Sequence, residues 1–205
     1  PCSFGDVNRY PVHPFHYALA ERFDRLDIVA RLDAMRLAAA RPAAAEGWPA
    51  AVECLLFHPR RRPRPAPAAR RVARHYAKLD WYFLADRWPE PKLYLSVRGG
   101  TTEVPHGHMD LTSFHAVVED EGLLVNIGPQ KYLDTTFGPR RWELHEMTPA
   151  SKNVVLINGV GIARPSRVSS RTLTVGEYPA VRMDATQAMG VMRDGAVARF
   201  YGRLF

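Results

Sequence analysis

Hydrophobic positions in the first part of the chain recur at helical spacing. Between Phe15 and about Ala40 they fall every three or four residues, with charged residues between them. This period predicts an amphipathic helix, because residues three and four apart share one face. Pro42, Gly47 and Pro49 then mark turns, and a second, short helix is predicted from Ala50 to Phe57.

From Tyr76 onward the pattern becomes typical of strands. The predicted strands and hairpins cover residues 79–85, 92–98, 112–128, 153–162, 171–175, 180–185 and 190–205. Turns are predicted near Asp120, at Asn158-Gly159 and near Asp194. Several strands without intervening long helices favour an antiparallel sandwich or barrel, so the predicted fold class is α+β, helices first and strands second.

A proline- and arginine-rich stretch separates the helical pattern from the strand pattern. Residues 58–74 contain four prolines, and six arginines precede Val72. Proline at this density excludes helix and central strand, which predicts an exposed, extended linker. We therefore expect a helical segment over 1–75, ending in this linker, and an antiparallel β-sandwich over 76–205. The arginines are best interpreted as a solvated connection, with a polyanion-binding strip as the alternative.

The composition indicates an anionic partner but does not identify which one. The 205 residues suffice for one sizeable domain or two small ones, and the net charge of +7 favours nucleic acid, anionic lipid or acidic polysaccharide. Two cysteines, Cys2 and Cys54, imply no disulfide framework, and no apolar run approaches the ~20 residues of a membrane helix. Because the chain starts at Pro1 without an initiator Met or signal peptide and stops at Phe205 in an apolar run, we expect it to be a piece of a longer protein.

Gly99 to Asp110 concentrates the candidate chemistry. His106, His108 and Asp110 lie within five residues, and on an extended chain all three would point one way. Two imidazoles and a carboxylate on one face could share a proton or hold a cation. The alternative is a polar loop tip rich in histidine. Small residues around them would let a ligand approach the backbone, namely Gly99, Gly100 and Gly107.

Residues 93–163 contain an ordered set of motifs. The segments are Tyr94-Leu-Ser-Val-Arg-Gly-Gly, His106-Gly-His-Met-Asp-Leu-Thr-Ser-Phe, Leu123-Leu-Val-Asn-Ile-Gly-Pro-Gln-Lys-Tyr, Arg141-Trp-Glu and Asn153-Val-Val-Leu-Ile-Asn-Gly-Val-Gly. Together they resemble the heparinase II/III-like family of polysaccharide lyases. The resemblance implies an α/α toroid followed by an antiparallel β-sandwich, so residues 1–57 would be the last toroid helices. It also implies a periplasmic or secreted protein.

The resemblance implies β-elimination of uronate-containing glycans, such as a glycosaminoglycan or alginate. His106 matches the catalytic histidine of the family's sandwich domain. The family's catalytic tyrosine, and the Asn or His that neutralises the uronate carboxylate, lie on toroid helices and have no match in residues 1–57. Candidate substrate-binding residues are Tyr132, Arg141 and Lys152, since aromatic rings stack on sugars and cationic side chains grip carboxylates. For Tyr132 and Arg141 a structural role is an equal alternative.

Family members often bind zinc, and here the resemblance points to an incomplete ligand set. The three ligand positions correspond to His108, Asn126 and Lys152. A neutral amide is a poor zinc ligand and a protonated ammonium is none, so we expect no cofactor unless Asp110 or His145 compensates. We hypothesise instead that the Lys152 ammonium replaces the metal's charge and braces His108 or Asn126.

Three functions compete on the sequence alone. The first is a portion of a lyase acting on acidic polysaccharide, and the second is a non-catalytic carbohydrate-binding or structural module. A nucleic-acid-binding role is disfavoured because aromatic residues are not interleaved with the basic run, and no membrane partner is expected. The oligomeric state stays open. His115 is predicted to be a packed or surface histidine rather than catalytic, and Asp110 with Ser113 to fix the loop locally.

Overall fold

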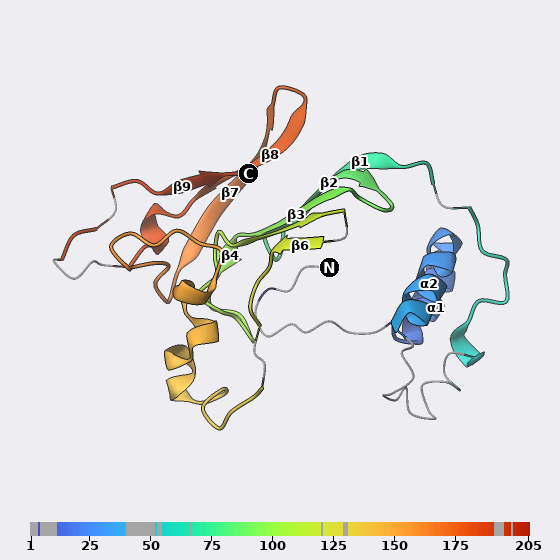
Figure 1. Cartoon of the computed structure of the whole chain (residues 1–205), viewed down its shortest axis with the longest axis horizontal. Helices are drawn as coiled ribbons and strands as arrows, with labels where there is room; N and C mark the ends of the chain where they lie inside the picture. Colours follow the sequence, from blue (N-terminus) through green and yellow to red (C-terminus); the bar gives the residue numbers. More distant parts are fainter. Residues whose placement is uncertain are drawn as a thin grey trace. The chain divides into compact units, whose positions relative to one another are not determined.

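The computed structural model divides the chain into two compact units. It describes residue 4 and residues 12–39, 52, 55–65, 67–119, 121–128, 131–190, 195–197 and 199–205. One unit comprises Arg9–Ala68, and the other comprises Pro1–Asn8 with Ala69–Phe205. Helices dominate the first unit and strands the second (Figure 1). Among these described residues, no helix has the length and apolar character required to cross a bilayer.

The smaller unit is a short helical hairpin. Its elements are α1 (Phe15–Arg22), the 3₁₀ helix η1 (Leu26–Ile28) and α2 (Val29–Ala39). The prediction of one continuous helix is wrong, because the chain turns at Asp24 with a left-handed φ of 52°. The Arg25 N–H donates to the Ala20 carbonyl (2.7 Å) and the Asp24 N–H to the Glu21 carbonyl (3.1 Å), which is the Schellman pattern that ends helices.

A small apolar cluster holds this hairpin together. Its buried members are Val12, Tyr17, Ala20, Leu26 and Val29. Of the predicted helix over 50–57, Val52 and residues 55–57 are described, and they are helical. The prediction that these helices are the end of a toroid stays a prediction.

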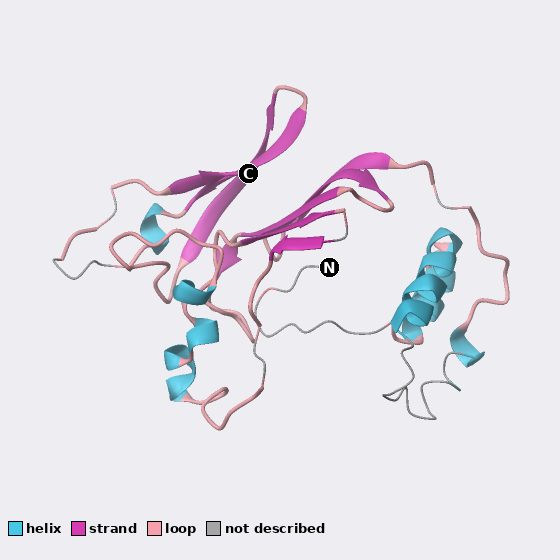
Figure 2. Cartoon of the chain, viewed as in Figure 1, coloured by secondary structure: helices cyan, strands magenta, loops and turns pink. Residues whose placement is uncertain are grey.

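The larger unit is built from two antiparallel sheets (Figure 2). The five-stranded sheet has the order β1 (Arg70–Tyr76), β2 (Trp81–Trp88), β3 (Leu93–Arg98), β5 (Phe114–Val118) and β6 (Glu121–Leu124). The four-stranded sheet has the order β4 (Gly100–Thr101), β7 (Arg167–Val175), β8 (Tyr178–Asp184) and β9 (Gly202–Leu204). Short 3₁₀ helices complete the unit: η2 (Pro139–Glu143), η3 (His145–Met147), η4 (Pro149–Ser151) and η5 (Thr186–Ala188). The predicted α+β class with an antiparallel sandwich is confirmed.

The core of the larger unit joins residues of both sheets. Tyr82 and Val97 come from the five-stranded sheet, and Val168, Val181 and Met183 from the other. All five are almost completely buried. The apolar side chains of these strands are therefore buried where the two sheets face each other.

Two details of the predicted elements are wrong. The linker does not extend to residue 74, since β1 begins at Arg70, once the last proline (Pro67) is passed and consecutive backbone N–H groups are again available for a ladder. The turn at Asn158 and Gly159 forms, with left-handed φ values of 51° and 78°. Its flanks make one isolated bridge instead of strands. The turn predicted near Asp194 lies outside the described residues.

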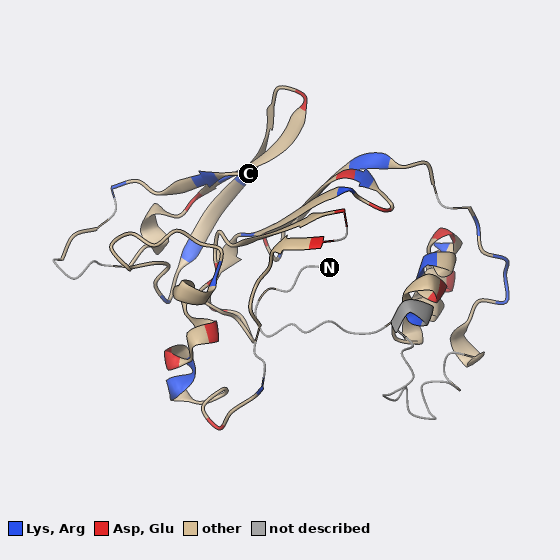
Figure 3. Cartoon of the chain, in the orientation of Figure 1, with Lys and Arg blue, Asp and Glu red and all other residues tan. Residues whose placement is uncertain are grey.

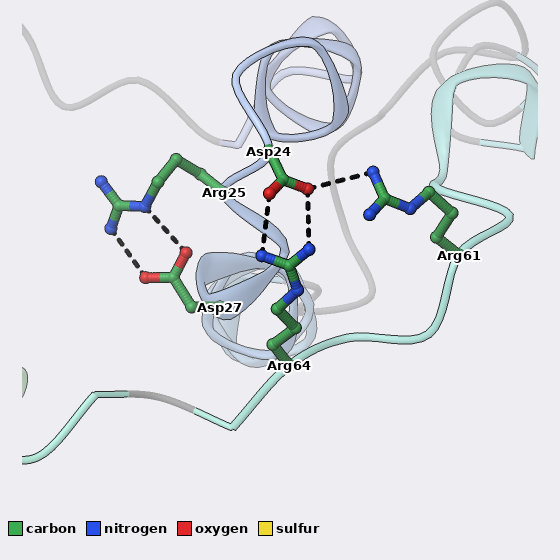
Figure 4. Close-up of polar contacts among 5 residues, drawn as sticks. All are labelled: Asp24, Arg25, Asp27, Arg61 and Arg64. Atoms are coloured by element: carbon green, nitrogen blue, oxygen red, sulfur yellow. Dashed lines mark hydrogen bonds and ion pairs between the residues drawn. The ribbon is translucent and has the colours of Figure 1, made fainter.

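Part of the arginine-rich linker folds back on its own unit (Figure 4). Arg64 holds Asp24 with two hydrogen bonds of 2.9 Å, and Arg61 adds an ion pair at 3.0 Å. The hydrogen bond from Arg64 lowers the pKa of Asp24. Arg25 and Asp27 form a second pair close by. These exposed contacts tie the linker to the helices, which favours the structural interpretation of its arginines over a free strip.

Candidate active site

His106 lies in a tight turn between β4 and β5. The Gly107 N–H donates to the Val104 carbonyl (3.0 Å), which closes the turn. The backbone of His106 has a left-handed φ of 56°, and its side chain is exposed. A Cβ atom on Gly107 would lie 2.9 Å from the Val104 carbonyl oxygen, so the turn requires glycine there. The absence of a side chain at Gly107 therefore makes room for the Val104 carbonyl of the same turn.

His108 and Asp110 point away from solvent. Both side chains are fully buried, so the prediction that they share one face with His106 is wrong. The reason is local, because the chain leaves the extended conformation at His106. Nothing in the described turn presents a three-residue metal face.

A buried ion pair fixes the inner side of the turn. The guanidinium of Arg98, at the end of β3, makes a short contact with the Asp110 carboxylate, and its other terminal nitrogen donates to the Thr101 carbonyl (3.2 Å). The Ser113 N–H donates to the Asp110 carbonyl (3.0 Å), although the Ser113 hydroxyl has no hydrogen-bond partner among the described residues. Asp110 therefore fixes the loop locally with Ser113, as expected, and in addition through its carboxylate and Arg98. A buried pair of this kind is sensitive to the loss of either member.

Two exposed aromatic rings accompany His106. The Phe137 ring meets the His106 ring edge-on, with centroids 5.7 Å apart, and Tyr132 lies 5.0 Å from Phe137. Tyr132 is 47% and Phe137 64% exposed. Rings exposed to this degree present faces on which a sugar ring can stack. Tyr132 was a sequence candidate; Phe137 was missed, although its place five residues later in a glycine-flanked loop was a usable signal.

Arg141 connects this aromatic loop to the histidine turn. Its side chain is buried, and its guanidinium donates to the Thr136 carbonyl (2.8 Å) and to the Gly107 carbonyl (3.1 Å). The same guanidinium lies over the rings of Phe137 and Trp142. This geometry is that of a brace between two loops. A direct role of Arg141 in gripping substrate stays a prediction.

The residues at the family's metal positions do not fit a zinc ion. Asn126 and Lys152 are both buried, and the Lys152 ammonium donates to the carbonyl of Ile127 (2.9 Å). Within the described ranges, no three His, Cys, Asp or Glu side chains gather closely enough to hold a metal. Asp110 is engaged by Arg98, and His145 is exposed. His108 is therefore the one side chain of the three positions that zinc accepts as a ligand, and the anionic or imidazole side chains that would complete the set are lacking.

His115 is a packed residue, as the sequence indicated. It lies opposite Ser96 in the β3–β5 ladder, and its ring packs against the Phe4 ring with centroids 4.7 Å apart. Burial lowers the pKa of His115 to about 4, so the imidazole is neutral at physiological pH. Neither its Nε2 atom nor the Ser96 hydroxyl has a hydrogen-bond partner among the described residues.

Asp80 holds the glycine pair that precedes the turn. Its carboxylate accepts the Gly100 N–H (3.0 Å), and a Cβ on Gly99 would lie 2.1 Å from the same carboxylate. The other carboxylate oxygen accepts a hydrogen bond from the Ser170 hydroxyl and contacts His75 Nε2 at 2.9 Å. The space beside Gly99 and Gly100 is therefore filled by Asp80 of the same chain, and not left for a ligand as predicted. Asp80 ties the end of β3 to β7, which no sequence signal indicated.

Comparison with known proteins supports the fold and leaves the family open. No family model matches the chain, and no curated protein matches it. Among solved structures it is similar to a mutant of the heparan sulfate lyase HepC from Pedobacter heparinus, with a TM-score of 0.57 and 9% sequence identity. The match covers 91% of this chain and 25% of the lyase, so this chain spans about a quarter of that protein. At this identity the likeness shows a shared fold.

Proposed function

We propose that this chain is the sandwich portion, with adjoining helices, of a polysaccharide lyase that cleaves uronate-containing glycans by β-elimination. The observation that carries the proposal is His106, exposed beside two exposed aromatic rings, in a chain whose fold is like that of a heparan sulfate lyase. An acidic polysaccharide also matches the net charge of +7. A periplasmic or secreted location belongs to the same proposal.

The proposed reaction requires one proton to leave and one to arrive. A base removes the C5 proton of the uronate, its electron pair forms the C4–C5 double bond, and the C4–oxygen bond breaks. The leaving oxygen then takes up a proton. An imidazole can perform either transfer near neutral pH, and general acid–base catalysis of this kind contributes roughly 10²–10⁴-fold to the rate. We assign His106 to this proton transfer.

Other groups would have to complete the site. The C5 proton becomes acidic enough only when the charge of the neighbouring carboxylate is offset. Tyr17, a tyrosine of the helical unit, is not a base for this step: it is fully buried and donates to Asp33 (2.8 Å). Burial and this hydrogen bond raise the pKa of Tyr17 to about 12. The proposal therefore assigns the second catalytic group and the carboxylate neutraliser to parts of the whole protein other than the helices described.

For the positions that bind zinc in the family, we retain the charge-replacement hypothesis. Lys152 is buried, and its ammonium is bound to the carbonyl that follows Asn126, where it can supply positive charge without a metal. This supports a bracing role for Lys152 over direct contact with substrate. Tyr132 and Phe137 are the residues we assign to sugar stacking.

The test is a lyase assay on the full-length parent protein. A panel of sulfated and non-sulfated uronate glycans is incubated with enzyme, and the ultraviolet absorbance of the unsaturated product is followed. His106→Ala should lower the rate by about 10²-fold or more. His145→Ala, which removes another exposed histidine of the same unit, should leave it within about twofold. Full activity of His106→Ala would remove His106 from the mechanism.

A non-catalytic carbohydrate-binding module is the second candidate. It is favoured by the incomplete metal positions together with the exposed Tyr132–Phe137 rings, which could bind sugar without any proton transfer. Glycan binding by the parent without any unsaturated product across the whole panel would favour this function over the lyase.

A further inference from the structure

The outer face of the four-stranded sheet carries an unusual pairing of like charges. In the β7–β8 ladder Arg171 lies directly opposite Arg182. The pairs on either side of it contain Val181 and Met183, and both of these side chains are fully buried in the sandwich core. Because side chains alternate between faces, Arg171 and Arg182 must project from the opposite, outer face. Both are exposed.

This arrangement is unfavourable unless something offsets it. Directly opposed residues in an antiparallel ladder have Cβ atoms about 4.5–5.5 Å apart, and like charges at that position are destabilising. Among the described residues, no hydrogen bond or ion pair engages Arg171, Arg182 or Arg167, a third exposed arginine on the same face. β7 (Arg167–Val175) contains two arginines and no acidic residue, and a basic segment is visible at one end of it in Figure 3.

The acidic group of this ladder is already engaged. Asp184 shares the outer face, and its carboxylate accepts hydrogen bonds from the backbone and the hydroxyl of Thr186, at 3.0 and 2.8 Å. These bonds lower the pKa of Asp184, which keeps it ionised as a cap for the following turn. It lies two residues from Arg182, whose charge also lowers the pKa of Asp184, and opposite Ser169, so it does not lie between Arg171 and Arg182.

We propose that Arg171, Arg182 and Arg167 form a binding face for an acidic polysaccharide, distinct from the His106 turn. The opposed pair would hold one carboxylate or sulfate group, because two guanidiniums can donate several hydrogen bonds to one anion. Arg167 lies four residues from Arg171 along β7, about 13 Å at the rise of an antiparallel strand, and would hold a second anionic group of the same chain. The choice of glycan rests on the proposed function.

The sequence of the face argues against nucleic acid as its partner. Residues 167–174 and 180–184, which surround the arginines, contain no aromatic side chain. Single-stranded nucleic acid is held by aromatic rings on which bases stack, in addition to a basic groove. The exposed ring of β8, Tyr178, lies at the other end of the hairpin, where Arg71 covers it, so the arginines suit a polymer whose recognition depends on its anionic groups.

A charge reversal tests the face and controls for folding in one step. In Arg182→Glu the new carboxylate faces Arg171, so the repulsive pair becomes an attractive one and the melting temperature should stay equal or rise. Affinity for heparin, used as the probe in a solution titration with the whole chain, should fall about tenfold or more, with a shallower salt dependence. Lys78→Glu makes the same change of net charge at the β1–β2 turn, and should alter affinity by less than about threefold.

Two results would overturn the proposal. Equal losses in Arg182→Glu and Lys78→Glu would mean that overall charge, and not this face, binds heparin. Duplex DNA that binds as tightly as heparin and loses affinity equally in Arg182→Glu would identify a general polyanion surface. The lyase assay is independent: loss of heparin binding in Arg182→Glu with no lyase activity in the parent protein would reject the proposed function and leave the face in place.

Discussion

The outer and inner halves of the candidate site differ in how their polar groups are solvated. The outer half comprises the exposed rings of His106, Tyr132 and Phe137. The inner half contains the Arg98–Asp110 ion pair and fully buried His108. A polar group in water can be replaced at little cost, whereas a buried one leaves its partner desolvated when it is removed. Substitutions in the outer half should therefore change activity, and those in the inner half should change stability.

The strongest test of this comparison is removal of the buried carboxylate. Asp110→Ala leaves the Arg98 guanidinium buried without its counter-ion, and should lower the free energy of unfolding by about 3–5 kcal/mol in urea denaturation. The exposed pair of Arg140 and Glu143 is the matched control, since Glu143→Ala should cost less than about 0.5 kcal/mol. Equal costs in the two variants would contradict the buried character of the inner half.

The pH dependence of stability provides a second test. The pKa of His115 is about 4 in the folded state and near the ordinary 6.5 when unfolded, so below pH 6.5 the unfolded chain binds more protons. Stability contributed by neutral His115 is complete above pH 6.5 and is lost as the pH falls toward 4, by about 3 kcal/mol in total. His115→Gln should flatten this part of the curve of unfolding free energy against pH. If His115→Gln follows the curve of the unmodified protein between pH 4 and pH 6.5, burial of His115 is not the source of the slope.

Comparison of the two neighbouring histidines gives an effect of intermediate size. His108→Ala empties a fully buried site and should lower the free energy of unfolding by about 2–4 kcal/mol. His106→Ala should change it by less than about 0.5 kcal/mol. Chemical denaturation of both variants measures the difference, and a larger cost for His106→Ala would reverse the assignment of outer and inner halves.

The smallest expected effect concerns metal. Dialysis against a chelator, followed by addition of zinc, should move the melting temperature by less than about 1 °C, because a protein is stabilised only by an ion that binds its folded state. The residues at issue are His108, Asn126 and Lys152, whose donor set does not fit zinc. One tightly held zinc per purified chain would contradict the charge-replacement hypothesis for Lys152.

Much of the fold was predictable because its signals are local. The hairpin of β5 and β6 follows from two apolar runs around a short turn, and the left-handed turn at Asn158 and Gly159 follows from the residues themselves. The helix break at Asp24 was not predictable, since an aspartate in the left-handed conformation interrupts an apolar period that continues on both sides.

The sequence by itself determined the α+β class and the main strands, because these depend on neighbours within a few residues, whereas the turn at His106 appeared only in the structure. Tertiary structure alone decided which polar groups are buried and with what partners. Arg141 contacts Gly107 from 34 residues away, and Ser170 contacts Asp80 from 90 residues away. Arg171 and Arg182 are opposed through strand register. The physical reason is that burial and cross-strand register are set by how the sheets pack, and this packing cannot be read from the spacing of residues along the chain.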